Sequence, residues 1–297
     1  MLARMLRITI AMQMLFGAAL GYWLADNSAG FSGMLPSIVL VALAAPLVGN
    51  TITIVLGFIK ARPDEPEALW LRAVVGEILA SARFFLLRQP WAFAAPVLLP
   101  AMGQPARIPV LLVHGLVCNH RVWEALVPAL REQGHTVLAI NLEPLFCSLD
   151  DYAPQLEHAV QTLLQQTGQA QVALVGHSMG GVAIRAWMRR YGTAKVARAI
   201  TLGTPHMGTQ AKGMVSTINS VQMSWQSDWL QELSASETDA TRSLLRIALT
   251  PQDNVVYPQR AQTLPGITPT VFEGRGHLQL CTDADVRKWV CAQLLLG

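Results

Sequence analysis

Residues 171–192 read QVALVGHSMGGVAIRAWMRRYG, and this stretch decides the fold. Its beginning, Val172–Val175, is a short apolar run that predicts a buried strand. Its second half, Gly180–Tyr191, predicts a helix that ends before Gly192. Between strand and helix lies the pattern G-x-S-x-G with Ser178 at its centre, which is typical of a sharp turn that presents a nucleophile.

The turn around Ser178 explains the residue types beside it. Passing directly from strand to helix places the central residue in strained backbone angles. Gly176 and Gly180 flank it, because Cβ atoms at these two positions would prevent the turn from closing. The serine oxygen then stands clear of the sheet beside a helix N-terminus, whose amides favour developing negative charge.

Around this stretch, short apolar runs alternate with helical patterns from about residue 105 to residue 297. The predicted strands are Ile108–Val113, His135–Leu142, Gln171–Gly176, Val196–Gly203, Leu244–Thr250 and Thr268–Glu273. The predicted helices are Arg121–Gln133, Leu149–Gln166, Gly180–Tyr191 and Thr282–Leu296. This alternation predicts an α/β fold, with a mostly parallel sheet and helices on both of its faces.

A serine of ordinary basicity needs a general base and a group that orients the base. In this architecture the acid and the histidine follow the serine, each at the carboxyl end of a later strand. Asp253 follows the strand that ends at Thr250, and His277 follows the strand that ends at Glu273. We therefore predict that the imidazole of His277 takes the proton of Ser178, while Asp253 holds the imidazole tautomer.

Other residues compete for these roles. Asp253 could simply cap a turn, and His277 could be a surface histidine. The less well placed candidates for the acid are Glu273, Asp228 and Asp239. His114 precedes the serine, so we expect it to brace its own loop rather than act as the base. Cys118 lies close by, but no base is assigned to it, so it is interpreted as a small apolar residue.

An oxyanion hole is the third requirement of this chemistry. The sequence Val113-His114-Gly115-Leu116 follows the first clear strand of the α/β region. The amides of Leu116 and of Met179, the residue after the nucleophile, could converge on the carbonyl oxygen of a substrate.

Residues 105–297 resemble an α/β hydrolase, specifically the bacterial true-lipase and esterase branch. The motifs that carry the resemblance are HGL (114–116), GHSMGG (176–181), LGTPHMGT (202–209), DNVV (253–256) and GHLQL (276–280). In that family they form the oxyanion loop, the nucleophile turn, the turn that leads into a lid, the acid loop and the histidine loop. The resemblance implies an α/β-hydrolase fold, supports Ser178, Asp253 and His277 as the triad, and supports the amides of Leu116 and Met179 as the oxyanion hole.

Calcium is the one metal that the resemblance raises, because some relatives bind a structural calcium near the histidine loop. Asp283 and Asp285 lie nearby in the sequence but match no ligand set. We therefore expect neither a metal nor a cofactor.

The insert at residues 207–243 is rich in methionine, tryptophan and aliphatic residues and has few charges. Met214, Ile218 and residues 221–225 fall at helical spacing, which predicts an amphipathic helix. Over a hydrolase site such a segment can act as a lid that exposes apolar surface when open. The alternative is ordinary packing of an inserted pair of helices.

The apolar excess of the chain lies at its N-terminus. The charged side chains within residues 1–59 are Arg4, Arg7 and Asp26. Ile8–Leu24 and Leu35–Ile59 are each long enough to cross a bilayer, which takes about 20 apolar residues. Ala25–Gly33 is predicted to be the tight loop of a transmembrane hairpin. Pro46 and Asn50 predict a kink and an interhelical hydrogen bond within the second span.

Two other interpretations of these N-terminal spans are possible. Residues 1–7 are basic and precede an apolar stretch, as in a cleaved signal peptide. Both spans could also be core helices of a soluble protein. The length of the first span, the Tyr22-Trp23 pair at its end and the immediate second span favour the hairpin.

Lysine and arginine set the expected orientation. Arg4 and Arg7 precede the hairpin, Lys60 and Arg62 follow it, and the short loop has neither residue type. The positive-inside rule then places both ends, and the α/β domain, in the cytoplasm of a bacterium, with the hairpin in the inner membrane. A reducing compartment makes disulfides among the four cysteines improbable.

Residues 60–104 are predicted to be a connector. Glu65–Leu87 has the pattern of a helix with Arg72, Arg83 and Arg88 on one side. This helix could lie on the cytoplasmic leaflet or pack on the following domain. The stretch 91–100 is too short, and too interrupted by proline, to span a membrane.

Composition excludes several function classes. Charged residues make up 14% of the 297 residues and the net charge is +3, against about 25% charged residues in typical domains. A disordered protein, a coiled coil or a highly charged nucleic-acid binder is therefore not expected.

The leading hypothesis is a membrane-anchored serine hydrolase that acts on acyl-ester or lipid substrates. The alternatives are a thioesterase or acyltransferase with the same triad, and an inactive membrane scaffold; oligomeric state is left open.

Overall fold

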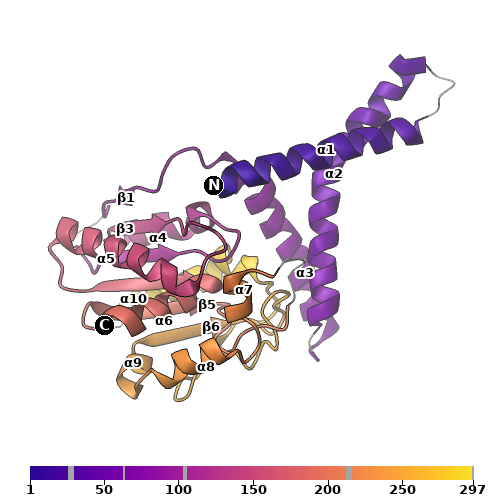
Figure 1. The fold of residues 1–297 in the computed structure, drawn as a ribbon. Coiled ribbons are helices and arrows are strands. Elements are labelled where there is room, and N and C mark those ends of the chain that lie inside the picture. Colours follow the sequence, from indigo (N-terminus) through magenta and orange to yellow (C-terminus); the bar gives the residue numbers. More distant parts are fainter. Residues whose placement is uncertain (26–29, 63, 103–105, 212–215, 296–297) are drawn as a thin grey trace.

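The computed structural model describes residues 1–25, 30–62, 64–102, 106–211 and 216–295. An α/β domain forms one part of the molecule, and a helical arm made of α1 and α2 projects from it (Figure 1). The α/β domain carries the nucleophile turn, so its sheet is described first.

The sheet has seven strands in the order β1-β3-β2-β4-β5-β6-β7. The parallel strands are β2 (Val110–Val113), β3 (Val137–Ile140), β4 (Val172–His177), β5 (Val196–Leu202), β6 (Leu245–Leu249) and β7 (Thr270–Val271). All six coincide with predicted strands, so the predicted α/β fold is confirmed. At one edge the two-residue strand β1 (Leu98–Leu99) pairs antiparallel with β3; it was not predicted, because so short a strand has no readable periodicity.

Both faces of the sheet are covered, which explains why its strands are apolar throughout. In β2, Leu111 and Val113 face the core under α5 (Ala153–Thr167) and α6 (Met179–Tyr191). Val110 and Leu112 face the opposite core, under α4 (Leu126–Glu132) and α10 (Ala284–Leu295). Each such fully buried aliphatic side chain contributes about 1.5–3 kcal/mol to stability.

Two predicted helices begin with a tighter turn than expected. The segment predicted at 121–133 is the 3₁₀ turn η4 (His120–Trp123) followed by α4. The segment predicted at 149–166 is the 3₁₀ turn η5 (Leu149–Tyr152) followed by α5. Such turns are common at helix starts, and the side chains of Asn119 and Ser148 cap the two turns.

The N-terminal arm consists of two long helices, α1 (Leu2–Leu24) and α2 (Gly30–Ala61). Both are long and apolar enough to cross a membrane, and most of their residues are not buried inside the protein. That exposure is unlike the core helix of a soluble protein. The two helices touch through small residues: a Cβ atom on Gly17 would lie 2.6 Å from the carbonyl oxygen of Val41.

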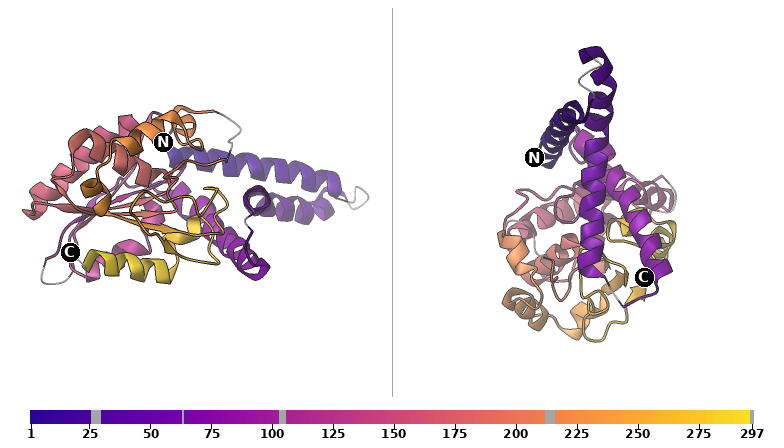
Figure 2. Two further views of the ribbon diagram at one scale, coloured as in Figure 1. Left: turned by 90° about the horizontal axis from the view of Figure 1, so that it is seen from below. Right: turned by 90° about the vertical axis from the view of Figure 1, so that its right-hand side faces the viewer.

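Helix α2 bends near its middle (Figure 1), where Pro46 lacks a backbone donor. Its first half runs beside α1, and its second half runs beside α3 (Glu67–Ala82), as Figure 2 shows from two further directions. The side-chain oxygen of Asn50 accepts a 2.7 Å hydrogen bond from the Ser81 hydroxyl of α3. The predicted kink and the predicted interhelical hydrogen bond are therefore both present.

Some predicted boundaries at the N-terminus were wrong. The loop predicted at 25–33 is shorter, because residues 30–33 already belong to α2; Asp26 lies outside the described residues. The helix predicted at 65–87 ends at Ala82 and continues as the π-helical turn η2 (Arg83–Arg88).

The connector packs on the α/β domain, one of its two predicted placements. The aromatic ring of Phe84 is fully buried in the core of that domain. Arg83 and Arg88 both pair with Glu124, at 2.7 and 3.2 Å. The side chains of Leu71, Val75 and Leu79, on another side of α3, are exposed.

Candidate active site

Ser178 stands at the turn between β4 and α6 in a strained backbone conformation, with φ 54° and ψ −127°. Its amide donates a 2.9 Å hydrogen bond to the carbonyl of Leu202 at the end of β5. A Cβ atom on Gly176 would lie 2.6 Å from the amide nitrogen of Gly181, and one on Gly180 would lie 2.2 Å from the carbonyl oxygen of Val113. The glycines predicted to flank the serine are therefore sterically required.

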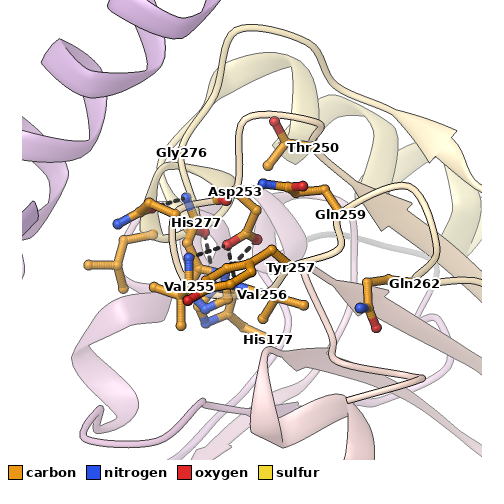
Figure 3. A network of polar contacts seen from close by, with 12 residues as sticks. His177, Thr250, Asp253, Val255, Val256, Tyr257, Gln259, Gln262, Gly276 and His277 are labelled. Atoms are coloured by element: carbon orange, nitrogen blue, oxygen red, sulfur yellow. Dashed lines mark hydrogen bonds and ion pairs between the residues drawn. The ribbon is translucent and has the colours of Figure 1, made fainter. Parts of the chain in front are cut away.

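Asp253 and His277 form a buried pair (Figure 3). Asp253 lies in the loop after β6, where its Oδ1 accepts hydrogen bonds from the amides of Val255 and Val256 at 2.8 and 2.7 Å. Its Oδ2 lies 2.7 Å from Nδ1 of His277. Because the carboxylate is fixed by two backbone donors, it holds the Nδ1–H tautomer and leaves Nε2 of the imidazole as the basic nitrogen.

The surroundings of His277 raise its pKa above the usual 6.5. Burial alone would lower the pKa, since a charged imidazole is poorly solvated there. The negative charge of Asp253, its hydrogen bond to Nδ1 and the charge of Glu77 outweigh burial. The imidazole is thus prepared to accept a proton.

Neighbouring residues bring this pair to the serine turn. The ring of His177, the residue before the serine, lies 4.6 Å from that of His277 between centroids, and its Nε2 donates a 3.1 Å hydrogen bond to the carbonyl of His277. A Cβ atom on Gly203, just after β5, would lie 3.3 Å from both Oδ2 of Asp253 and Nδ1 of His277. The structure therefore brings all three sequence-predicted residues to the carboxyl end of the sheet.

The hydroxyl of Ser178 makes no hydrogen bond to His277 within the described part of the chain. In free enzymes this contact is often long and tightens when substrate binds. The geometry thus shows a formed acid–histidine pair beside the serine turn.

The predicted oxyanion loop passes directly against the serine. A Cβ atom on Gly115 would lie 2.8 Å from Cβ of Ser178. The amide of Met179 is at the first position of α6, where no intrahelical acceptor exists. Among the hydrogen bonds of the described residues, neither this amide nor that of Leu116 is a donor.

His114 braces the oxyanion loop. Its Nδ1 donates to the carbonyl of Gly115 at 2.8 Å, and its Nε2 accepts from the amide of Leu142 at 2.9 Å. Burial lowers its pKa to about 4, so the ring is neutral and both nitrogens are occupied. Burial likewise raises the pKa of the Cys118 thiol to about 12, as expected of a residue that acts as a small apolar group.

The rival carboxylates lie elsewhere. Glu273 is half exposed and lies 3.9 Å from Arg260. Asp228 and Asp239 begin the short helices α8 (Asp228–Ala235) and α9 (Asp239–Ser243) of the insert.

The two acidic residues near the histidine loop form ion pairs with an arginine side chain. Asp283 and Asp285 pair with Arg275 at 3.1 and 2.7 Å. Among the residues that the structure describes, no cluster of three or more His, Cys, Asp or Glu side chains could hold a metal.

The insert departs from its predicted helix. Of the residues predicted to form it, Ile218–Gln222 is helical (α7) and residues 223–225 are not, while Met214 and Val215 lie outside the described residues. The helix ends early because the backbones of Met223 and Trp225 hydrogen-bond across to Thr209 instead, at 2.9 and 3.0 Å.

Sequence reasoning missed Glu77, a fully buried carboxylate of α3. It accepts hydrogen bonds from the amides of Leu278 and Gln279, the two residues after the histidine. A signal was present: an acidic residue stands on the buried face of a helix whose other buried residues are Ala73, Ala80, Ser81 and Phe84. A charge at such spacing is rarely accidental, because burying an unpaired carboxylate is costly.

Known proteins agree with this architecture. A family model described as the alpha/beta hydrolase fold matches residues 108–242. A triacylglycerol lipase of Burkholderia plantarii is 29% identical over 168 residues, which cover 54% of this chain and 45% of the relative. A triacylglycerol lipase of Pseudarthrobacter phenanthrenivorans is 33% identical over 121 residues, which cover 38% and 37%. The match thus spans less than half the length of either relative.

A solved structure shows the same fold. The mature form of the Bacillus licheniformis lipase BlEst2 aligns with a TM-score of 0.55 at 19% identity, over 66% of this chain and 95% of that one. The matched model, the parallel sheet and this likeness show an α/β-hydrolase fold. Together with the two relatives, they confirm the resemblance to the lipase and esterase branch.

Proposed function

We propose that this α/β hydrolase, which resembles the lipase and esterase branch, is a serine ester hydrolase for lipophilic acyl esters. The observation that carries the proposal is the buried Asp253–His277 pair, joined at 2.7 Å beside the strained turn of Ser178. Ser178 is the proposed nucleophile, and the amides of Leu116 and Met179 are the proposed oxyanion hole.

The proposed reaction has two halves. Nε2 of His277 takes the hydroxyl proton as Oγ of Ser178 attacks the ester carbonyl, and the oxyanion accepts hydrogen bonds from the two amides. The imidazolium then gives its proton to the leaving alcohol, which leaves an acyl-enzyme. Water repeats the sequence: it loses a proton to His277, attacks the acyl carbon, and Oγ of Ser178 regains the proton as the acid departs.

The proposal is tested with the full chain purified in detergent. A fluorophosphonate probe should label the protein, and nitrophenyl esters from short to long acyl chains should be hydrolysed, with a preference for the longer members. A protein that is folded but neither labelled nor active would contradict the proposal and favour the inactive scaffold.

The pH dependence of hydrolysis should report the raised pKa of His277. Only the neutral imidazole can accept the serine proton, so kcat/KM should fall about tenfold per pH unit below that pKa. The midpoint of this acid limb should lie above pH 6.5, the usual value for histidine. Initial rates between pH 5 and 9 with one ester measure it; a rate independent of pH down to 5 would exclude His277 as the base.

The arm is proposed to anchor the enzyme in the inner membrane with the α/β domain in the cytoplasm. Leu2 and Leu6 of α1 are buried against Leu145 of the domain, which supports a retained helix rather than a cleaved signal peptide. Lys60 and Arg62 follow the hairpin on the proposed cytoplasmic side. A reporter that works only in the cytoplasm should give a signal when it is fused after residue 65. A signal from a reporter that works only in the periplasm would contradict this orientation.

Helix α7 is proposed to belong to a lid over the site. Its Asn219 donates hydrogen bonds to the carbonyl of Leu145 and to the sulfur of Met179, the proposed oxyanion residue. On the outer side of the same helix, the side chains of Ile218 and Val221 are 59% and 55% exposed. This apolar face is suited to contact acyl chains.

Charging the outer face of α7 should change chain-length preference. In the double variant Ile218→Glu, Val221→Glu, kcat/KM for long-chain esters should fall about tenfold relative to short-chain esters, because a charge replaces apolar contact. Val97→Glu, at an equally exposed valine near β1, serves as the matched control. An unchanged ratio of long-chain to short-chain activity would rule out the lid.

A further inference from the structure

We infer that Glu77, in the helix that connects the arm to the domain, is a positioning residue for the proposed catalytic histidine. The inference rests on the proposed function of His277. It means that the N-terminal region does more than attach the enzyme to a membrane, since it supplies a group that holds the histidine loop.

The carboxylate of Glu77 contacts the backbone of the two residues after His277. Its Oε1 accepts a 2.9 Å hydrogen bond from the amide of Leu278, and its Oε2 accepts a 3.0 Å hydrogen bond from the amide of Gln279. Both amides belong to the first turn of the 3₁₀ helix η6 (Leu278–Cys281), for which His277 is the N-cap residue. One carboxylate from α3 therefore satisfies two donors that the turn itself leaves unpaired.

The packing around this carboxylate leaves little freedom. A Cβ atom on Gly276 would lie 2.5 Å from Oε2 of Glu77, and one on Gly76 would lie 2.3 Å from Oε1 of Gln279. Helix α3 and the histidine loop thus approach each other at glycines on both sides. Moving the carboxylate would move the backbone on which the imidazole of His277 is carried.

Helix α2 is linked by Gln259 to the loop that carries Asp253. Nε2 of Gln259 donates hydrogen bonds to the carbonyl of Ala61, the last residue of α2, and to the carbonyl of Asp253, at 2.7 and 2.9 Å. The neighbouring Asn254 accepts a hydrogen bond from the amide of His277 through its Oδ1. The two helices therefore brace the Asp253–His277 pair from both of its loops.

Charge adds to this positioning. The titratable groups that interact electrostatically with Glu77 are His277, Asp253, Cys118 and Cys281. Burial raises the pKa of both thiols, so at neutral pH neither carries a charge. Burial also raises the pKa of Glu77 to about 7, against the lowering effect of its two backbone hydrogen bonds and of His277. When ionised, Glu77 favours the protonated imidazole and raises the pKa of His277.

The test compares Glu77→Gln with Glu77→Asp in the full-length protein, using a short nitrophenyl ester. Gln keeps the length but loses the charge and turns an NH₂ group toward one amide. Asp keeps the charge but is too short to reach both amides. We expect kcat to fall about 10- to 100-fold in both variants with KM within about twofold, since substrate contacts are untouched.

The pH profile separates the two effects. The acid limb of kcat/KM should move to lower pH in Glu77→Gln, because the charge that raises the pKa of His277 is gone. It should stay in place in Glu77→Asp. Hydrogen exchange of the peptide that covers residues 276–282 should become faster in both variants.

Ser81→Ala is the matched control, because it removes a polar contact of the same helix, to Asn50, without touching the histidine loop. It should keep the wild-type kcat and pH profile. Wild-type kcat, profile and exchange in Glu77→Gln would overturn the inference, as would an equal loss of kcat in Ser81→Ala. A wild-type protein that no fluorophosphonate labels would instead overturn the proposed function, while the exchange experiment would still report whether Glu77 holds the histidine loop. If Glu77→Gln does not fold, kcat and exchange of Glu77→Asp decide.

Discussion

Replacing Ser178 with alanine should lower kcat for ester hydrolysis about 10⁶-fold, the loss seen when the nucleophile of a serine triad is removed. The physical reason is that no other described hydroxyl stands at this turn, so no acyl-enzyme can form. The methyl side chain fits the same strained backbone without a new clash. Labelling by a fluorophosphonate probe should disappear while the thermal unfolding midpoint stays within a few degrees.

The design of this experiment separates chemistry from folding. Residual hydrolysis in Ser178→Ala should be insensitive to the fluorophosphonate. Because the hydrogen bond from the Ser178 amide to Leu202 uses only backbone atoms, the turn should persist in the variant. Retention of more than a tenth of wild-type activity would mean that another residue is the nucleophile.

Replacing Asp253 with asparagine should lower kcat about 10⁴-fold, with little change in KM. The Oδ1 contacts to Val255 and Val256 leave Oδ2 as the partner of His277. In the variant an NH₂ group would occupy that place and face Nδ1, which favours the tautomer with its proton on Nε2. That tautomer cannot accept the proton of Ser178.

Asp283→Asn is the matched control, because this carboxylate is also paired, with Arg275 at 3.1 Å, but does not touch His277. It should retain most of the wild-type kcat. Rates at saturating ester measure both variants, and circular dichroism confirms their folding. If Asp253→Asn lost less than tenfold, another carboxylate would have to orient the imidazole, and Glu77 would be the first to examine.

The agreement between sequence and structure is best where the information is local. The turn at Ser178 follows from two glycines and from a change of hydrophobic period within a few residues, so its strain was predictable. The order of Asp253 and His277 along the chain was predictable too, because each follows a recognisable strand. The predicted length of helix α7 was too great. Its hydrophobic periodicity gave no sign of the backbone hydrogen bonds that join Thr209 to Met223 and Trp225, just beyond the helix.

What the amino-acid sequence determined by itself is the α/β fold, the strained serine turn, the apolar hairpin and the identities of the three proposed catalytic side chains. These depend on hydrophobic period and backbone sterics over short stretches of chain. Only the tertiary structure decided that Glu77 holds the histidine loop, because that contact joins residues 201 positions apart. The burial of Glu77 could be inferred from its place on an apolar helix face, but its partners could not, because only the packing of α3 against the histidine loop removes the water that would otherwise satisfy these groups.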